Sequence, residues 1–216
     1  MGLLAVFLIS YLVGAIPTAV LAGKILRGID IRQHGSKNAG ATNAWRVLGW
    51  RAGLSVLAVD LCKGLAAAGL VSRLPLGPLP LGLGNVSVLC GLCAVIGHVF
   101  PVYVGFRGGK GVATAAGMLL ATAPWPMACA AGVFLVTVLL SGFVSLGSML
   151  GAVCIPVLVA VFGRHGVGSY PPLLLGLAAA LPLFILFTHR KNIVRLAHGT
   201  ELPFAGLPIW KRRSPP

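Results

Sequence analysis

Residues 3–23 read LLAVFLISYLVGAIPTAVLAG, an apolar stretch that contains no charged side chain. About 20 predominantly apolar residues are enough for an α-helix to cross the hydrocarbon core of a bilayer. A secretory signal peptide carries basic residues before its apolar stretch, whereas here Lys24 and Arg27 follow it. We therefore expect an uncleaved first transmembrane helix, interrupted by Pro17, with the N-terminus outside the cell.

Hydrophobic stretches of this kind recur along the chain. Of its 216 residues, 57% are hydrophobic and only 9% are charged, whereas a soluble domain carries about 25% charged residues. The fold class that this composition predicts is all-α, a polytopic membrane helical bundle that forms a single domain over residues 1–216. The expected spans are residues 3–23, 52–71, 81–104, 112–123, 127–140, 143–162 and 172–188.

The number of spans depends on residues 112–140. A straight helix over residues 112–123 would reach only about 18 Å, and Pro124-Trp125-Pro126 is expected to form a turn after it. We predict seven spans, with five spans and a re-entrant hairpin as the alternative, because short segments are tolerated where they tilt or pack against protein. Both arrangements place the C-terminus in the cytoplasm.

Basic residues set the predicted orientation. The chain has 17 Lys and Arg but only three acidic residues, for a net charge of +14. The basic residues lie between apolar stretches, which favours an anionic membrane face and anionic substrates over nucleic acid. They concentrate in residues 24–51, 105–111 and 189–216, while Arg73 and Arg164 fall on the other side. By the positive-inside rule we expect a multi-pass membrane protein whose three polar stretches lie on the cytoplasmic face.

Two groups inside the spans have structural interpretations. All five cysteines lie in apolar stretches, so Cys90-x-x-Cys93 is interpreted as helix packing and not as a metal or redox pair. Asp60 and Lys63 are three positions apart in the second span, where buried charges usually pair. We favour a structural ion pair over direct chemistry, and we interpret His98 as a satisfied interior histidine.

The first polar segment is Gly35-Ser36-Lys37-Asn38-Ala39-Gly40-Ala41-Thr42-Asn43, followed by Arg46. Its glycines can turn backbone N–H groups toward a ligand, and its Ser, Asn and Thr side chains add neutral donors. Its two basic side chains add charge. This pattern suits an anion that is bound through many hydrogen bonds, and an ordinary loop with a helix cap is the alternative.

The second polar segment is Phe106-Arg107-Gly108-Gly109-Lys110-Gly111-Val112-Ala113-Thr114. Three glycines around a lysine at the start of a helix predict a backbone nest for phosphate, to which the helix N-terminus adds partial positive charge. The glycine spacing differs from that of a Walker A loop. A glycine-rich membrane turn anchored by its basic side chains is the alternative.

The third polar segment is His189-Arg190-Lys191-Asn192-Ile193-Val194-Arg195, with His198-Gly199-Thr200-Glu201 after it. Such a juxtamembrane basic cluster is commonly a lipid head-group anchor. However, His189 and Asn192 are three positions apart and share one helical face. Both side chains can orient a hydroxyl group or accept its proton.

Taken in order, these residues resemble the bacterial acyl-phosphate:glycerol-3-phosphate acyltransferases, a membrane family. The likeness rests on Gly-Ser-x-Asn-x-Gly-Ala-Thr-Asn, Gly-Gly-Lys-Gly-Val-Ala-Thr and His-Arg-x-Asn-Ile-x-Arg-Leu, and it runs from Ser10-Tyr11-Leu12 to Glu201. Two positions depart from the family pattern: Lys37 stands where the family usually has Gly, and Ala39 where it usually has Pro. We expect altered loop stiffness and charge but a retained site.

The resemblance implies an activity and a set of residues. The family transfers an acyl group from acyl phosphate to the 1-hydroxyl of glycerol 3-phosphate, giving lysophosphatidic acid and phosphate in the first step of phospholipid synthesis, without a metal or cofactor. Its motifs imply catalytic roles for Ser36, Lys110, His189 and Asn192. They imply substrate binding by Asn38, Gly40, Thr42, Asn43, Arg46, Gly108, Gly109, Gly111, Thr114 and Glu201. No nucleic-acid partner is expected, and the oligomeric state stays open, including a monomer.

Other functions fit the residues less well. The signature His-x4-Asp of soluble-type acyltransferases is absent, and a CDP-alcohol phosphotransferase needs a cluster of aspartates where this chain has two. A membrane transporter of phosphorylated solutes is the alternative that we retain, although no inverted repeat is visible. For the acyltransferase, direct attack of the hydroxyl on the acyl carbonyl is expected, with His189 or a substrate phosphate oxygen as the base.

Overall fold

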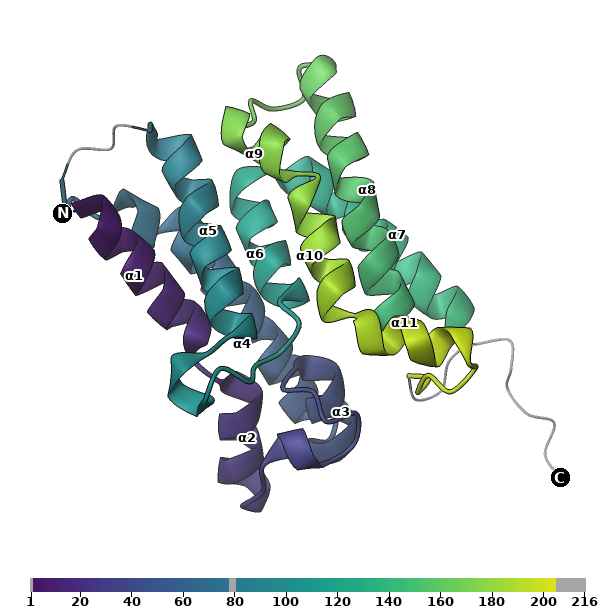
Figure 1. The fold of residues 1–216 in the computed structure, drawn as a ribbon. Helices are drawn as coiled ribbons and strands as arrows, with labels where there is room; N and C mark the ends of the chain where they lie inside the picture. The colour runs from purple at the N-terminus through teal and green to yellow at the C-terminus, as the bar shows by residue number, and fades with distance from the viewer. Residues whose placement is uncertain (1, 78–80, 205–216) are drawn as a thin grey trace, which may run out of the picture. The chain divides into compact units, whose positions relative to one another are not determined.

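The computed structural model describes residues 2–77 and 81–204, which form helices joined by turns and loops (Figure 1). The chain divides into two compact units, Met1–Pro124 with Ser169–Leu174, and Trp125–Gly168 with Leu175–Pro216. The helices of the first unit are α1 (Gly2–Ala15), α2 (Thr18–Arg27), α3 (Ala41–Leu48), α4 (Trp50–Gly69), α5 (Leu83–Val99) and α6 (Val112–Thr122), with short turns η1 (Ile31–Gln33), η2 (Val71–Arg73) and η3 (Val102–Val104).

The second unit is built from α7 (Pro124–Ser141), α8 (Val144–Arg164), α10 (Ala180–Thr188) and α11 (Arg190–Ala197). The short helix α9 (Pro172–Leu177) lies where the chain passes from the first unit into the second. Within this unit α10 packs against α8, and α11 follows α10 directly. The residues of the third polar segment are therefore carried by α11 and the turn after it.

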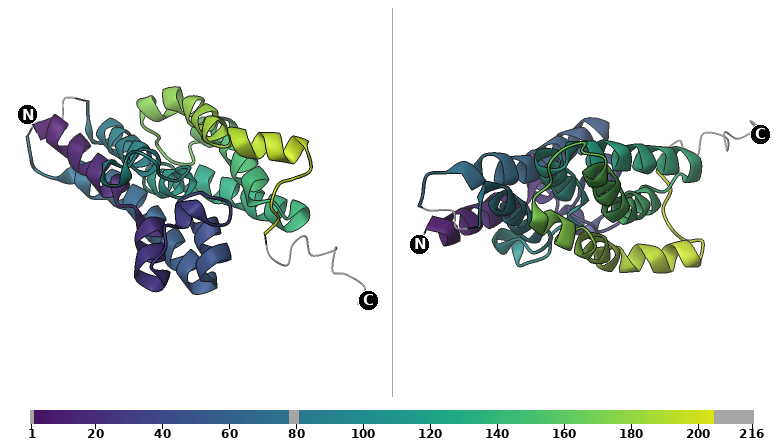
Figure 2. Two further views of the ribbon diagram at one scale, coloured as in Figure 1. Left: turned by 60° about the horizontal axis from the view of Figure 1, so that its bottom comes forward. Right: turned by 90° about the horizontal axis from the view of Figure 1, so that it is seen from above.

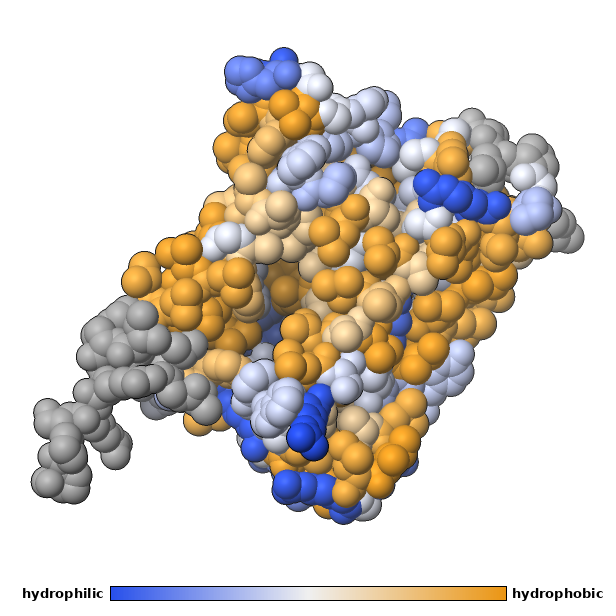
Figure 3. All heavy atoms as spheres, turned by 180° about the vertical axis from the view of Figure 1, so that it is seen from behind, coloured by the Kyte–Doolittle hydropathy of each residue, from blue (hydrophilic) through white to orange (hydrophobic). Residues whose placement is uncertain are grey.

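Five stretches of the described residues are long and apolar enough to cross a membrane: Gly2–Arg27, Trp50–Arg73, Leu83–Val104, Pro124–Ser141 and Val144–Arg164. Large apolar side chains remain exposed on them, such as Leu8 and Leu57, and the face in Figure 3 is largely apolar. These observations confirm the polytopic helical class. Because α6 has 11 residues and α10 has 9, the count of seven spans stays a prediction.

Several expected helix boundaries were wrong, and proline explains one of them. The expected interruption at Pro17 is present, because Pro17 has no N–H to continue the ladder of α1, but α2 runs on to Arg27, beyond the expected end at residue 23. The expected turn at Pro124-Trp125-Pro126 is instead the first turn of α7, where proline is tolerated because first-turn N–H groups lack helical partners. Residues 172–188 are broken between α9 and α10.

The long polar stretch of residues 24–51 also contains more helix than expected. It includes the end of α2, the whole of α3 and the first residues of α4. Figures 1 and 2 show α2 and α3 next to each other, and both contact α4. The first polar segment is therefore a compact turn between packed helices rather than an extended loop.

Small residues let the helices of the first unit approach closely. A Cβ on Gly14 would overlap the backbone of Ala94, so α1 and α5 pack backbone to backbone. A Cβ on Gly64 or on Gly117 would likewise overlap the backbone of the facing helix in the pair α4 and α6. This packing fixes α6, which carries the end of the second polar segment, against the helix that carries Asp60.

Candidate active site

The first polar segment folds around the side chain of Asn43, which is fully buried at the start of α3. Its Oδ1 accepts a 2.8 Å hydrogen bond from the backbone N–H of Ser36. Its Nδ2 donates to the carbonyl oxygens of Ile31, His34 and Asn38 at 3.1, 3.0 and 3.0 Å. The amide of Asn43 is thus engaged by the loop itself, and it holds Ser36 in place.

Two residues beside Ser36 have left-handed backbone conformations. Gly35 and Lys37 both have φ of 59°, a region that glycine enters freely and other residues rarely adopt. A Cβ on Gly35 would also collide with the Asn43 side chain. The left-handed conformation at Lys37 explains why glycine suits this position in the family pattern.

The polar side chains that this turn presents are half-buried. Ser36, Asn38, Thr42 and Arg46 are all of intermediate exposure, whereas Asn43 is buried. Gly40 precedes α3 in an extended conformation, with φ of −146°. The turn can therefore offer hydroxyl, amide and guanidinium donors to a ligand from one short stretch of chain.

An ion pair in the turn before the first polar segment reaches the start of the second. Arg32 pairs with Asp30 at 2.7 Å and donates from Nη1 to the carbonyl oxygens of Val104 and Arg107, at 2.9 and 3.3 Å. The hydrogen bond from Arg32 lowers the pKa of Asp30 to about 2. Arg32 was not among the expected site residues.

The second polar segment is seated on the C-terminal end of α5. The N–H of Gly108 donates to the carbonyl of Val99 at 3.1 Å, and that of Gly109 donates to the carbonyl of His98 at 3.2 Å. A Cβ on Gly108 would lie 2.6 Å from Cδ of Pro101. In this structure these two amides bond to α5, and substrate binding by Gly108 and Gly109 stays a prediction.

The groups of this segment that can donate hydrogen bonds to an anion are Lys110 and the first backbone N–H groups of α6. Gly111 precedes α6 with φ of 83°, and the first N–H groups of a helix have no partner within it. Together with the half-buried Lys110, they form a positively charged helix start of the kind that binds phosphate. By contrast, the side chain of Thr114 is fully buried, and its hydroxyl has no hydrogen-bond partner within the described structure.

The two polar segments of the first unit meet at Gly109. A Cβ at this position would lie 2.8 Å from the carbonyl oxygen of Ala39, which belongs to the first segment. It would also overlap the imidazole of His98. Glycine is required here because backbone and ring approach its Cα from both sides.

Asp60 is the centre of a buried polar cluster. Its Oδ1 lies 2.6 Å from Nζ of Lys63 and accepts a 3.0 Å hydrogen bond from the hydroxyl of Thr18. Nδ1 of His98 lies 3.6 Å from the same oxygen, and Lys63 also donates to the carbonyl of Ile16 at 2.5 Å. The expected ion pair is present, and His98 joins it as a partner.

In the second unit, Glu201 connects α11 to the start of α8. Its Oε1 accepts hydrogen bonds from Asn192 at 2.6 Å and from Ser145 at 2.8 Å, and its Oε2 pairs with Arg195 at 2.6 Å. Burial alone would raise the pKa of Glu201, but the hydrogen bonds from Arg195, Ser145 and Asn192 lower it overall. The carboxylate therefore stays charged and orients the amide of Asn192.

The imidazole of His189 is 2% exposed, and its Nδ1 lies 2.8 Å from the carbonyl oxygen of Ile185. A carbonyl can only accept, so Nδ1 carries the proton of this contact. In the neutral ring, Nε2 is then the basic nitrogen. This tautomer suits a side chain that takes a proton from a hydroxyl.

Each of the three acidic residues of the sequence is paired with a nearby base: Asp30 with Arg32, Asp60 with Lys63, and Glu201 with Arg195. Because the sequence has so few acidic residues, Asp30 and its neighbour Arg32 could have been recognised from the sequence as an ion pair that holds the polar loops in place. In a chain of net charge +14, each carboxylate attracts several donors. Among the described residues, no group of three or more His, Cys, Asp or Glu could hold a metal ion.

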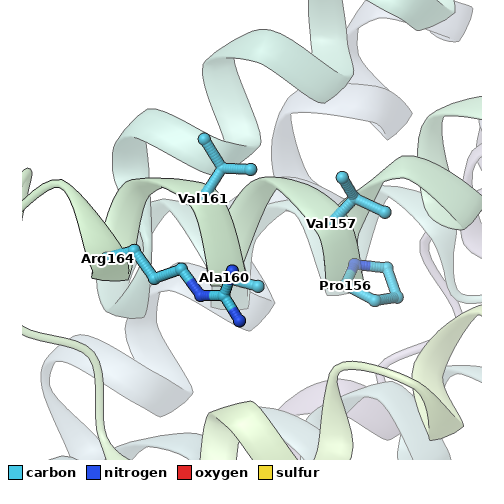
Figure 4. Close-up of a pocket in the computed structure, with 5 residues that line it drawn as sticks. All are labelled: Pro156, Val157, Ala160, Val161 and Arg164. Atoms are coloured by element: carbon cyan, nitrogen blue, oxygen red, sulfur yellow. The ribbon is translucent and has the colours of Figure 1, made fainter.

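A shallow hollow of about 390 Å³ lies along α8 (Figure 4). It is lined by Pro156, Val157, Ala160, Val161 and Arg164. None of the expected site residues lines it, and apart from Arg164 its lining side chains are apolar. We therefore assign the chemistry to the polar segments and not to this hollow.

Comparison with known proteins decides the family. The model of a family described as glycerol-3-phosphate acyltransferase matches residues 4–199. The chain belongs to this glycerol-3-phosphate acyltransferase family. The match covers all three polar segments up to Gly199 and so includes His189 and Asn192.

Curated relatives and solved structures agree with this membership. A glycerol-3-phosphate acyltransferase of Chlorobium phaeobacteroides (strain DSM 266 / SMG 266 / 2430) is 47% identical over 92% of this chain and 95% of its own length. One of Chlorobaculum tepidum (strain ATCC 49652 / DSM 12025 / NBRC 103806 / TLS) is 45% identical over 92% and 94%. The glycerol 3-phosphate form of PlsY (YgiH), an integral membrane glycerol 3-phosphate acyltransferase, is 32% identical with a TM-score of 0.81, covering 97% of this chain and 99% of that one. Its lysophosphatidic acid form has a TM-score of 0.79.

Proposed function

We propose that this membrane enzyme transfers an acyl group from acyl phosphate to the 1-hydroxyl of glycerol 3-phosphate, giving lysophosphatidic acid and phosphate. Family membership supports the acceptor and the class of reaction. One observation carries the choice of a phosphate-bearing donor. The first unit holds two anion-suited segments that approach each other at Gly109 and Ala39, and a reaction of two phosphate compounds needs two such segments.

The first unit would bind the phosphate groups. Lys110 and the start of α6 neutralise charge that develops on a phosphate in the transition state. Ser36, Asn38 and Thr42 with Arg46 bind and orient the polyol and its phosphate. The contacts of Asn43 support a positioning role for this residue, because its amide is engaged by the loop.

The second unit would supply groups for the attacking hydroxyl. The hydroxyl oxygen forms a bond to the acyl carbonyl carbon, and the bond from that carbon to the phosphate oxygen breaks, so phosphate leaves with the electron pair. The hydroxyl proton goes to Nε2 of His189 or to a phosphate oxygen of the substrate. Asn192 positions the hydroxyl, while Glu201 holds Asn192.

We also propose the cellular setting. Residues 24–51, 105–111 and 189–216 carry most of the basic residues, which supports a cytoplasmic active site in the bacterial inner membrane with an external N-terminus. Residues 1–216 are proposed as a single acyltransferase domain. The acyl chains of donor and product remain in the bilayer.

The assay that tests this function is product formation by purified protein in detergent or lipid mesophase. Palmitoyl phosphate, palmitoyl-CoA and palmitoyl carrier protein are each supplied with glycerol 3-phosphate, with and without a chelator. We expect lysophosphatidic acid from the acyl phosphate alone, regardless of chelator. Lys110→Ala should abolish it, while Lys24→Ala, which removes an exposed lysine at the end of α2, should not.

Two other outcomes would change the proposal. Product from the CoA ester or the carrier protein would keep the acyltransferase and overturn the donor. Without product from any donor, uptake of glycerol 3-phosphate into sealed vesicles would be measured, and transport there would replace the acyltransferase with the transporter alternative.

A further inference from the structure

The buried cluster around Asp60 has no role in the chemistry proposed above, yet it adjoins the glycine-rich segment. Asp60 and His98 are 2% and 8% exposed. They lie on α4 and α5, in stretches long and apolar enough to span a membrane. Ionisable groups at such depth are costly and usually mark a functional pathway or site.

His98 connects this cluster to the second polar segment. Its Nδ1 faces Oδ1 of Asp60 at 3.6 Å, while its Nε2 occupies the space that a side chain at position 109 would fill. Its backbone carbonyl accepts the 3.2 Å hydrogen bond from the N–H of Gly109. Ring and backbone of one residue therefore both contact the glycine that precedes Lys110.

Asp60 is itself held from three directions. Lys63 approaches from the same helix, Thr18 from the start of α2, and His98 from α5. Lys63 additionally bonds the carbonyl of Ile16, at the break between α1 and α2. A carboxylate fixed by the hydrogen bonds from Thr18 and Lys63 presents a stationary negative charge to Nδ1 of His98, 3.6 Å away, and so favours the ring orientation in which Nδ1 faces it.

We infer that His98 and Asp60 are positioning residues for the glycine-rich segment. Asp60 orients the His98 ring, the ring and the His98 carbonyl set the place of Gly109, and Gly109 sets where Lys110 and the start of α6 meet a substrate phosphate. The inference rests on the proposed function in one respect, namely that this segment binds a phosphate. Neither residue is assigned a contact with substrate.

His98→Asn is the direct test. It retains a donor toward Asp60 and removes the part of the ring beside Gly109. Displacements of about 1 Å can cost up to roughly 100-fold in rate, so we expect kcat/KM to fall by roughly 10- to 100-fold. The KM of only one substrate should rise, namely the substrate whose calorimetric binding Lys110→Ala weakens, while the KM of the other substrate stays unchanged.

A second variant guards against misfolding. Asp60→Asn combined with Lys63→Met removes both charges of the pair together and leaves no unpaired buried ion, which is the costly event. It should reproduce the kinetic defect of His98→Asn. The matched control is Ser87→Ala, since Ser87 is a buried, hydrogen-bonded residue of the same helix α5, near its opposite end. Its kinetics should equal those of the wild type.

Gly109→Ala provides a coupling test. In the wild type its Cβ collides with the His98 ring, whereas the shorter asparagine side chain leaves room for it. The cost of Gly109→Ala in kcat/KM should therefore be smaller in the His98→Asn background than in the wild type. If the effects of Gly109→Ala and His98→Asn on kcat/KM simply add, the His98 ring does not set the position of Gly109.

The inference is overturned if folded His98→Asn and the folded double variant both retain the kinetics of Ser87→Ala. It is also overturned if the KM values of both substrates change equally, because a general loss of packing would weaken the binding of both. Should the wild type use a donor other than acyl phosphate, the same comparison is made with that donor. Should it show no turnover, calorimetric binding of glycerol 3-phosphate and of palmitoyl phosphate replaces it: weaker binding of one of them by His98→Asn supports the inference, and equal binding of both overturns it.

Discussion

The side-chain amide of Asn192 donates a 2.6 Å hydrogen bond to the carboxylate of Glu201, which Arg195 and Ser145 hold from the other sides. Asn192 is 4% exposed, and this hydrogen bond to Glu201 helps to fix the orientation of its amide. The position of a group proposed to handle the attacking hydroxyl therefore depends on a residue nine positions further along the chain.

Glu201→Gln should lower activity more than stability. The glutamine keeps the shape but loses the charge, and its NH2 group can face the amide of Asn192, which turns that side chain away from the hydroxyl. We expect kcat to fall roughly 10-fold or more, with a small change in Tm. Ser148→Ala, which removes another buried hydroxyl of α8, is the control. Full activity of Glu201→Gln would contradict this role.

The same carboxylate predicts a pH dependence of stability. The pKa of Glu201 is lowered from its ordinary value of 4.5, so the folded protein binds this proton less readily than the unfolded chain. The stabilisation is present above 4.5 and is lost as the pH falls through the lower, folded pKa. The Tm difference between wild type and Glu201→Gln should be largest near neutral pH and shrink under acid. A difference that is constant with pH would exclude this linkage.

Lys37→Gly should stabilise the protein. Lys37 has φ of 59°, a left-handed conformation that costs a non-glycine residue about 1 kcal/mol. The gain is offset in part because glycine makes the unfolded chain more flexible, so we expect an increase of about 0.5 kcal/mol in the free energy of unfolding. Lys37→Ala removes the charge but keeps the strain, and it should give no gain in Tm.

Asn43→Asp should be more damaging than Asn43→Ala. The aspartate would turn two donors into acceptors that face the carbonyls of His34 and Asn38, and buried unsatisfied acceptors cost about 1–3 kcal/mol. Both variants should release Ser36 and lower kcat/KM. Asn85→Ala, at a half-buried asparagine that donates to the carbonyl of Leu81 and accepts from the N–H of Leu173, is the comparison for Tm and kinetics. Equal effects at Asn43 and Asn85 would refute the organising role.

Arg32→Lys should weaken catalysis through the two polar segments. A lysine can pair with Asp30 but cannot also reach the carbonyls of Val104 and Arg107 in the geometry of a guanidinium fork. We expect KM values for both substrates to rise, because Arg32 bonds Arg107 of the second segment and lies in η1, whose Ile31 accepts a hydrogen bond from Asn43 of the first. Arg190→Lys, at an exposed arginine that contacts the carbonyl and the ring of Phe187, should leave them unchanged.

The ion pair of Asp30 with Arg32 predicts a loss of stability at low pH. Its pKa is lowered to about 2 from 3.8, so its contribution is present above 3.8 and is lost as the pH falls toward 2. Asp30→Asn should therefore lower Tm at neutral pH and leave it unaffected near pH 2, as thermal scans across this range would reveal. A Tm deficit that persists at the acid end would count against the pairing with Arg32.

Much of the molecule could be predicted from particular residues. The apolar stretch of residues 3–23 indicated a membrane helix, and the spacing of Asp60 and Lys63 indicated their ion pair. Helix boundaries were less accurate, because Pro17 ends one helix whereas Pro124 begins another. Proline interrupts a helix when it follows the first turn but is tolerated within the first turn. Where a helix starts depends on packing, so the sequence alone does not say which effect applies.

What the sequence by itself determined is the membrane class, the three polar segments and the family, because hydropathy and motif order are properties of the linear chain. Only the tertiary structure decided how the segments use their polar groups. The amides of Gly108 and Gly109 bond to α5, the amide of Asn43 turns into its own loop, and His98 lies between Asp60 and Gly109. The partner of a hydrogen-bonding group depends on which distant residue is folded beside it, and no local pattern records that.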